Sequence, residues 1–332
     1  MIDLPVSVLD SGFPEDGVAA AQSQTDLVAL ARRAEQLGFL RFWVTEHHGS
    51  RIINGAAPPV IIARVAAETA SIRVGAGGVM LPNHSPVAVA EQFGTLEALV
   101  PGRIDLGIGQ GPGSFNAVYI DALRLGTPPL SSEGYSSRIR ELLGYLQADE
   151  TRAVRVALAE EHPPEVWLLS SSPASAGLAA EIGLPLSFAH HINPAATRES
   201  LALYRARFSP SRWLDRPRVM LSAGVICGDT DETAAELLRR AGRLRARAVE
   251  EQLVPTMPTA QKAQLTTAAS RAEESVRNYA WGGPTTVERE LTGLVDHFSP
   301  DELMLFPALG ELKDRIRCIE LISDQFPSSH PS

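Results

Sequence analysis

The chain has 332 residues, of which 44% are hydrophobic and 21% charged, and its formal net charge at pH 7 is −9. This composition is typical of a globular α/β protein with a large core, and it excludes a disordered or a fibrous chain. The acidic balance disfavours nucleic acids and membrane surfaces as partners, and the lack of a signal-like start or of an apolar stretch of about 18 residues predicts a cytoplasmic protein.

Short runs rich in β-forming residues alternate with amphipathic segments along the chain. The predicted strands are residues 6–9, 42–45, 73–79, 104–108, 166–169, 186–189, 219–226 and 302–306. Apolar residues recur at intervals of three and four in residues 25–36, 60–69, 86–98, 174–181, 231–250 and 287–296, which predicts helices there. Such alternation is typical of parallel βα units, and eight repeats favour a closed (β/α)8 TIM barrel over an open sheet.

We expect one barrel domain over residues 1–326, because barrels of this class routinely exceed about 250 residues. Residues 254–282 are polar and rich in Thr and Ala, and we expect them to form an insertion over the barrel mouth between the seventh and eighth strands. The tail, 327–332, is predicted to be disordered. The two cysteines, Cys227 and Cys318, lie far apart in sequence, which argues against a disulfide framework or a structural zinc site.

The functional residues of a TIM barrel gather where its strands end. The second predicted strand ends in Glu46, His47 and His48, and the sixth ends in His190 and His191. Adjacent residues of a strand point to opposite faces, so at most one of His47 and His48 enters the barrel mouth. That imidazole could act as an acid or base at neutral pH, or it could be structural, with Glu46 orienting it.

Several glycines lie in the third and fourth predicted strands. Residues 75–78 read GAGG, which indicates either the close approach of a ligand or a bulge at a crowded barrel corner. Residues 107–113 read GIGQGPG, which is not the dinucleotide pattern G-x-G-x-x-G. The fifth strand leads into SSSPAS (170–175) at the start of a helix, either an ordinary N-cap or an anion site.

Four stretches of the sequence resemble the bacterial luciferase-like monooxygenase family, in its single-chain branch. They are FWVTEHH (42–48), IRVGAGGVMLPNHSPVAVAEQFGTLEALVPGRIDLGIG (72–109), SSSPASAGLAAEIGLPLSFAHH (170–191) and GGPTTV with DELMLF (282–306). Together they span most of the predicted barrel in the family's order.

The resemblance implies that FMN binds at the barrel mouth. His47 matches the residue nearest the reactive edge of the flavin, where it would assist proton transfer, with Glu46 and His48 as the other catalytic candidates. The Gly77-Gly78 pair matches the place of a non-prolyl cis peptide that supports the flavin ring. The other cofactor-binding candidates are Gly109, Gln110, Ser171, Ser172, Ser175 and His190. Of these, the three serines match the positions that hold the phosphate, and His190 matches a position beside the ring.

Two departures from the family pattern bear on binding. Gln110 stands where many relatives have an arginine that helps to neutralise the phosphate. We therefore hypothesise either that the flavin binds more weakly or that the insertion supplies another cation. The turn after His48 also differs, so Arg51 could meet an acidic group of substrate or flavin, or lie on the surface. The candidates for the substrate pocket are Asp10, Arg51, Asn83, His84 and His191.

By the same resemblance, a separate reductase supplies reduced FMN, which reacts with O2 to a flavin C4a-(hydro)peroxide that oxygenates a small organic substrate. Relatives pair as dimers, so a homodimer is expected. One alternative keeps the fold and uses a deazaflavin coenzyme for hydride transfer; another is a non-catalytic flavin-binding protein. The H-x-H pattern of barrel metal hydrolases is missing, so no metal is expected.

Overall fold

The computed structural model describes residues 3–13, 20–50, 52–253 and 262–325. Eight strands form the central sheet. They are β1 (Val6–Asp10), β2 (Arg41–Val44), β3 (Arg73–Met80), β4 (Ile104–Gly109), β5 (Glu165–Ser170), β6 (Leu186–Ala189), β7 (Val219–Cys227) and β9 (Glu302–Phe306). Their hydrogen-bonded order is β6-β5-β4-β3-β2-β1-β9-β7, and β6 also pairs with β7, so the sheet is closed. The predicted (β/α)8 barrel is therefore confirmed, and all eight strands coincide with predicted ones.

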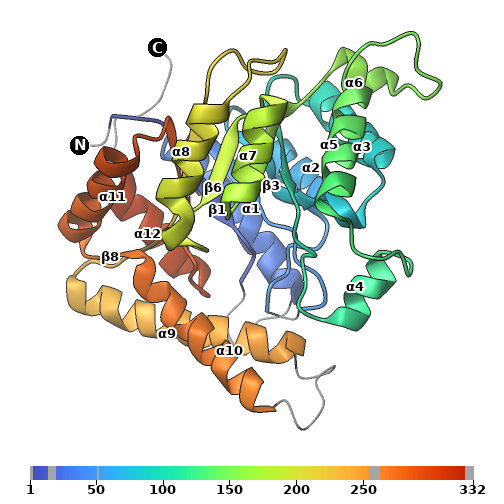
Figure 1. Ribbon diagram of the computed structural model, residues 1–332. Coiled ribbons are helices and arrows are strands. Elements are labelled where there is room, and N and C mark those ends of the chain that lie inside the picture. The colour runs from blue at the N-terminus through green and yellow to red at the C-terminus, as the bar shows by residue number, and fades with distance from the viewer. Residues whose placement is uncertain (1–2, 14–19, 51, 254–261, 326–332) are drawn as a thin grey trace.

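Helices surround this barrel and also cover one of its ends (Figure 1). They are α1 (Ala20–Gln36), α2 (Pro58–Glu68), α3 (Pro86–Leu99), α4 (Ala117–Leu123), α5 (Ser132–Tyr145), α6 (Ala157–Glu161), α7 (Pro173–Ile182), α8 (Thr197–Arg207), α9 (Asp231–Leu253), α10 (Lys262–Ser275), α11 (Pro284–Phe298) and α12 (Leu312–Ser323). No helix of the described residues is long and apolar enough to cross a membrane.

The core fills the barrel and the layer between strands and helices. All nine residues of β7 are buried, as expected for a parallel strand covered on both faces. Cys227 and Cys318 are buried free thiols. Burial raises the pKa of both thiols, which keeps them protonated at neutral pH.

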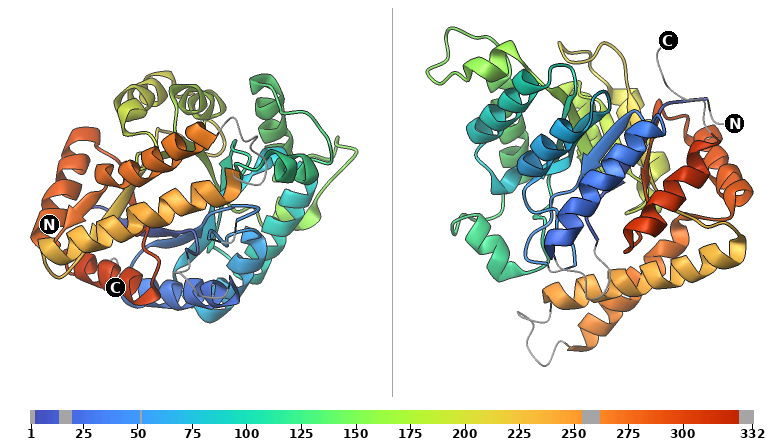
Figure 2. Two further views of the ribbon diagram at one scale, coloured as in Figure 1. Left: turned by 90° about the horizontal axis from the view of Figure 1, so that it is seen from below. Right: turned by 180° about the vertical axis from the view of Figure 1, so that it is seen from behind.

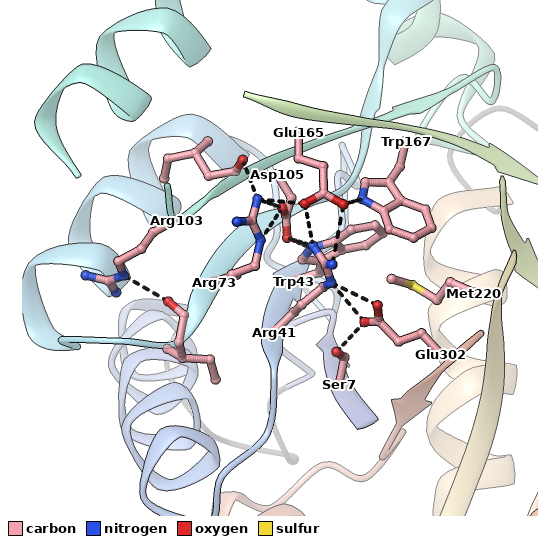
Figure 3. A network of polar contacts seen from close by, with 12 residues as sticks. Ser7, Arg41, Trp43, Arg73, Arg103, Asp105, Glu165, Trp167, Met220 and Glu302 are labelled. Carbon is pink, nitrogen blue, oxygen red and sulfur yellow. Dashed lines mark hydrogen bonds and ion pairs between the residues drawn. The ribbon is translucent and has the colours of Figure 1, made fainter. Parts of the chain in front are cut away.

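The N-terminal end of the barrel contains a network of six charged side chains from the strand starts and the residue before β7, and Figure 3 shows those from the strand starts. These residues, here called the ion network, are Arg41, Arg73, Arg218, Asp105, Glu165 and Glu302. Arg41 lies at its centre, with Nη1 at 2.9 Å from Asp105 and Nε at 2.9 Å from Glu302. Three cations face three carboxylates, so their charges compensate one another, which matters most for the buried Arg41, Asp105 and Glu302.

The opposite end, where the strands terminate, is the barrel mouth. Helices α9 and α10 pack against each other and cross over this mouth (Figure 2, left). Of the expected insertion, 254–282, the part that the structure describes forms α10, a 3-10 turn (Val276–Asn278) and a short strand, β8 (Ala280–Gly282), which pairs with β7 outside the barrel. Residues 254–261 and the tail, 327–332, lie outside the described residues.

Candidate active site

A cavity of about 570 Å³ lies inside the barrel mouth beneath α9 and α10. Each of the eight barrel strands, or the loop that follows it, contributes to its wall. Most of the lining is apolar and includes Leu9, Phe13, Trp43, Met304 and Phe306. The residues from α9 and α10, here called the roof, are Arg245, Ala248, Val249, Arg271, Ala272 and Ser275. The volume falls within the range of about 300–1,000 Å³ that small-molecule and cofactor sites occupy.

His47 lines this cavity. Its backbone N–H donates to the carbonyl of Gly55 at 2.9 Å, whereas no described residue hydrogen-bonds to its ring. Burial, aided by the positive charge of Arg245, lowers the pKa of the imidazole to about 4. The ring is therefore neutral at physiological pH, and one of its nitrogens can accept a proton inside the cavity.

Glu46 and His48 do not line the cavity but belong to a cluster behind its wall. One oxygen of Glu46, Oε1, lies 2.7 Å from Nε2 of His48 and 2.7 Å from Nε2 of His84. The other, Oε2, accepts the Met80 N–H at 3.0 Å. These bonds hold the Glu46 pKa at about 2 despite burial, so the carboxylate stays charged and fixes the loop that presents His47.

The ligand atoms of Glu46, His48 and His84 lie within 4.8 Å of one another, a grouping that could hold a metal ion. In the structure, Nε2 of each histidine is instead hydrogen-bonded to Oε1 of Glu46, so the atoms that would bind the metal already have partners. The expectation of no metal stays a prediction, and metal analysis of the purified protein tests it.

The peptide bond between Gly77 and Gly78 is cis, as the resemblance implies. Gly77 lines the cavity. A Cβ atom on Gly77 would lie 2.8 Å from the side chain of Leu9, and one on Gly78 would lie 2.6 Å from the Gly107 carbonyl. The pairing of β3 with β4 shifts register here. The bulge at a crowded corner is thus present, and the close approach of a ligand to Gly77 remains a prediction.

The serine cluster (Ser170, Ser171, Ser172 and Ser175) lines the cavity where β5 ends and α7 begins. Ser172 is the N-cap residue of α7, and its hydroxyl accepts from the Ser175 N–H. The hydroxyls of Ser170 and Ser172 lie 2.8 and 3.0 Å from that of Ser175. A concentration of hydroxyls and helix N–H groups facing a cavity is suited to an anion.

Gln110 and Gly109 also line the cavity, and Gln110 brings no charge to it. The cations come from the roof instead, as Arg245 of α9 and Arg271 of α10. Arg271 lies within the expected insertion, which favours the hypothesis of another cation supplied from there. No carboxylate occurs among the described residues of the lining.

The second histidine pair is placed differently from the expectation. His191 lines the cavity, with Nδ1 at 3.1 Å from the Ser222 carbonyl oxygen, whereas His190 does not line it. The Nδ1 atom of His190 lies 2.8 Å from the Thr197 hydroxyl, and its ring packs on Phe298. The chain turns directly after β6 ends at Ala189, and this turn directs His190 away from the barrel.

Most other candidates for the substrate pocket are engaged elsewhere. Asp10 is buried and bonded to Arg315 at 3.0 Å, and the Asn83 amide donates to the Pro112 carbonyl at 2.9 Å. Neither residue lines the cavity, nor does His84. Arg51 lies outside the described residues.

Comparison with known proteins decides the family. The sequence pattern of the family described as luciferase-like monooxygenase matches residues 5–297. The chain belongs to this family. A luciferase-like monooxygenase of Escherichia coli K12 is 34% identical over 322 residues, 96% of each chain. The uncharacterized protein YvbT of Bacillus subtilis is 38% identical over 97% of this chain and 96% of its own.

Solved structures of the luciferase-like fold agree. The crystal structure of apo-MsnO8 has a TM-score of 0.82 at 34% identity and covers 97% of this chain and 98% of its own. The oxygenating constituent of 3,6-diketocamphane monooxygenase from Pseudomonas putida, in complex with FMN, has a TM-score of 0.72 at 20% identity. An F420-dependent secondary alcohol dehydrogenase has a TM-score of 0.69 at 15% identity. The last two show the fold alone.

Several lining residues of this member of the family were not predicted from its sequence. Trp43 lies inside the FWVTEHH stretch, and an indole at the end of a barrel strand is a signal that could have been used. Arg245 gave no such signal because it is one of five arginines on α9, and Arg271 gave none because it lies in a polar segment without a distinctive pattern. Only the packing of α10 on α9 over the mouth selects these two.

Proposed function

We propose that this protein is a flavin-dependent monooxygenase that takes reduced FMN into the barrel-mouth cavity and transfers one oxygen atom of O2 to a small organic substrate. The observation that carries the proposal is the joint presence in one cavity of His47, the cis Gly77-Gly78 peptide bond and the serine cluster. The residues present fit FMN both at its phosphate and at its ring.

The serine cluster and the start of α7 would hold the phosphate. Ser171 offers a hydroxyl that no described residue bonds, and Ser172 and Ser175 lie beside it. The positive end of the helix dipole favours a dianion here. Arg271, for which the described residues provide no ion pair, supplies the cation that Gln110 does not.

The ring would lie against Gly77, where the missing side chain leaves backbone as the wall. His47 would stand beside the ring with a neutral imidazole, whose unprotonated nitrogen accepts a proton during the reaction and returns it later. Glu46, bonded to His48 and His84, fixes the loop and so positions His47 without entering the cavity.

The apolar walls and the roof would keep water from the reacting atoms. Bound reduced FMN supplies the chemistry that activates O2, and the protein orients it and controls protons. We propose further that a separate reductase delivers the reduced flavin and that the chain acts as a homodimer.

The test combines the purified protein, FMN, NADH and an unrelated flavin reductase under ¹⁸O2 with a panel of aldehydes, ketones, thioethers and aromatic compounds. We expect at least one product that gains a single ¹⁸O atom only when the protein is present. The proposal fails if the protein binds reduced FMN and every compound of a broad panel returns unlabelled.

A further inference from the structure

The roof places a second cation, Arg245, where the proposed flavin does not need it. Arg245 extends from α9 into the lining of the cavity, and the structure provides it with no ion pair among the described residues. Ala248 and Val249, one turn further along α9, line the cavity on the same helix face. Among the residues that the structure describes, no carboxylate therefore compensates the charge of this guanidinium.

Tyr279 positions this guanidinium. Nη1 of Arg245 donates to the Tyr279 hydroxyl at 2.7 Å, and the guanidinium carbon lies 5.8 Å from the centre of the phenol ring. Tyr279 is buried, and its ring occupies the space that a side chain at Gly224 of β7 would need, since a Cβ there would lie 2.3 Å from the ring. The strand β7 thus holds the buried Tyr279 side chain in place, and Tyr279 in turn fixes the position of the Arg245 guanidinium.

Arg245 is connected through Tyr279 to Gly224 of β7, the strand whose Ser222 carbonyl oxygen lies 3.1 Å from Nδ1 of His191. After burial, the positive charge of Arg245 is the next cause that lowers the pKa of His47, and it lowers the pKa of His191 as well. Arg271 is not a cause of either shift. The serine cluster follows β5, which β6 separates from β7 in the barrel, whereas the partner of Arg245, Tyr279, packs on β7. We therefore assign Arg245 to a ligand other than the flavin phosphate.

The surroundings leave the charge of Arg245 available to a ligand. The described lining includes no carboxylate, and Glu46, behind the cavity wall, already accepts bonds from two imidazoles and the Met80 N–H. An anion would meet a charge-assisted, bidentate donor in a site of low water content, where such bonds are strongest.

We propose that Arg245 binds an acidic group of the substrate, and that the substrate is an amphipathic anion: an apolar body with one carboxylate, sulfonate or phosphate group. The inference rests on the proposed function, since it takes the serine cluster to be occupied by the flavin phosphate. Tyr279 is the positioning residue of this site, and the apolar walls receive the body of the substrate.

The test uses pairs of ligands that differ in charge and little in shape, namely carboxylates from acetate to octanoate, and benzoate, each with its primary amide. Their affinities are measured by calorimetry with the FMN-loaded protein and with the flavin-free protein. We expect at least one carboxylate to bind about tenfold or more tightly than its amide in the FMN-loaded protein. Arg245→Met should abolish this preference, and Tyr279→Phe should reduce it while the charge remains.

Arg243→Met is the matched control, because Arg243 is exposed on the same helix and pairs with Glu236 outside the cavity. It should leave the preference unchanged. The proposal is overturned if no carboxylate is preferred, including the case in which neither member of any pair binds, or if the preference survives Arg245→Met. Failure of FMN to bind, with the carboxylate preference intact in the flavin-free protein, would reject the proposed function and retain the anion site.

Discussion

Trp43 donates its indole N–H to Oδ2 of Asp105 at 2.8 Å, and this bond connects the two ends of the barrel. Trp43 lines the cavity, while Asp105 belongs to the ion network at the N-terminal end (Figure 3). The ring of Trp43 also makes an edge contact with Trp167, at 5.9 Å between centroids. The ion network therefore supports the floor of the cavity as well as the barrel itself.

Replacing the central cation of the ion network should destabilise the fold strongly. Arg41→Met removes the one cation that bonds both Asp105 and Glu302, although Arg73 still bonds Asp105 and Arg218 still pairs with Glu302. Removal of one member of a buried charge set costs about 3–5 kcal/mol. Urea denaturation measures the free energy of unfolding. Arg64→Met is the control, because Arg64 pairs with Glu68 on the surface and should cost less than about 1 kcal/mol. Equal losses in the two variants would contradict the account.

His47→Asn should uncouple oxygen consumption from product formation. Without the imidazole, the proton is no longer managed beside the reacting atoms, so a larger share of the O2 consumed should appear as H2O2. We expect the rate of product formation to fall about 10²- to 10⁴-fold, the usual contribution of a general acid or base. Affinity for FMN should stay near that of the wild type. An unchanged product yield would remove His47 from the proposed chemistry.

The serine cluster should distinguish FMN from riboflavin, which lacks the phosphate. Ser171→Ala removes a hydroxyl that no described residue bonds, so the fold should be unaffected while FMN binds about tenfold or more weakly. Riboflavin should bind as before, and Arg271→Met should act in the same direction. Ser187→Ala is the control, because Ser187 lines the cavity outside the cluster. Parallel losses for FMN and riboflavin would place the phosphate elsewhere.

Stability should fall in mild acid partly because of His191. Burial lowers its pKa in the folded protein from 6.5 to about 4, so as the pH falls the unfolded chain takes up the proton first. The stabilisation is therefore complete above about pH 6.5 and is lost as the pH falls towards 4, by about 2 kcal/mol at pH 5. His191→Asn should flatten the decline in unfolding free energy between pH 7.5 and 5 by that amount. A decline of unchanged steepness would show that His191 titrates normally.

The barrel could be predicted from sequence because its strands are short apolar runs separated by helical periodicity. The exceptions are local. β8 has only three residues, Ala280–Gly282, too few for a periodic pattern. Residues 262–275 are polar and Thr/Ala-rich, and their helical state depends on packing against α9, a contact that no local pattern contains.

The histidine pairs show why site residues are harder to predict. Alternation of faces applies within a strand, but β2 ends at Val44, so His47 and His48 lie in a loop. Their directions are set by backbone bonds to Gly55 and Gly113, from other parts of the chain. One histidine of each pair lines the cavity: it is the first of the pair after β2, His47, and the second of the pair after β6, His191. The sequence alone does not show which member of a pair faces the cavity.

The most direct test of the central claim is a titration of the purified protein with reduced FMN and, separately, with reduced coenzyme F420, both without oxygen. The account predicts saturable binding of one reduced FMN per chain, weakened by Ser171→Ala, and no competition from F420. Tighter binding of F420, or FMN binding that is indifferent to the serine cluster, would contradict it.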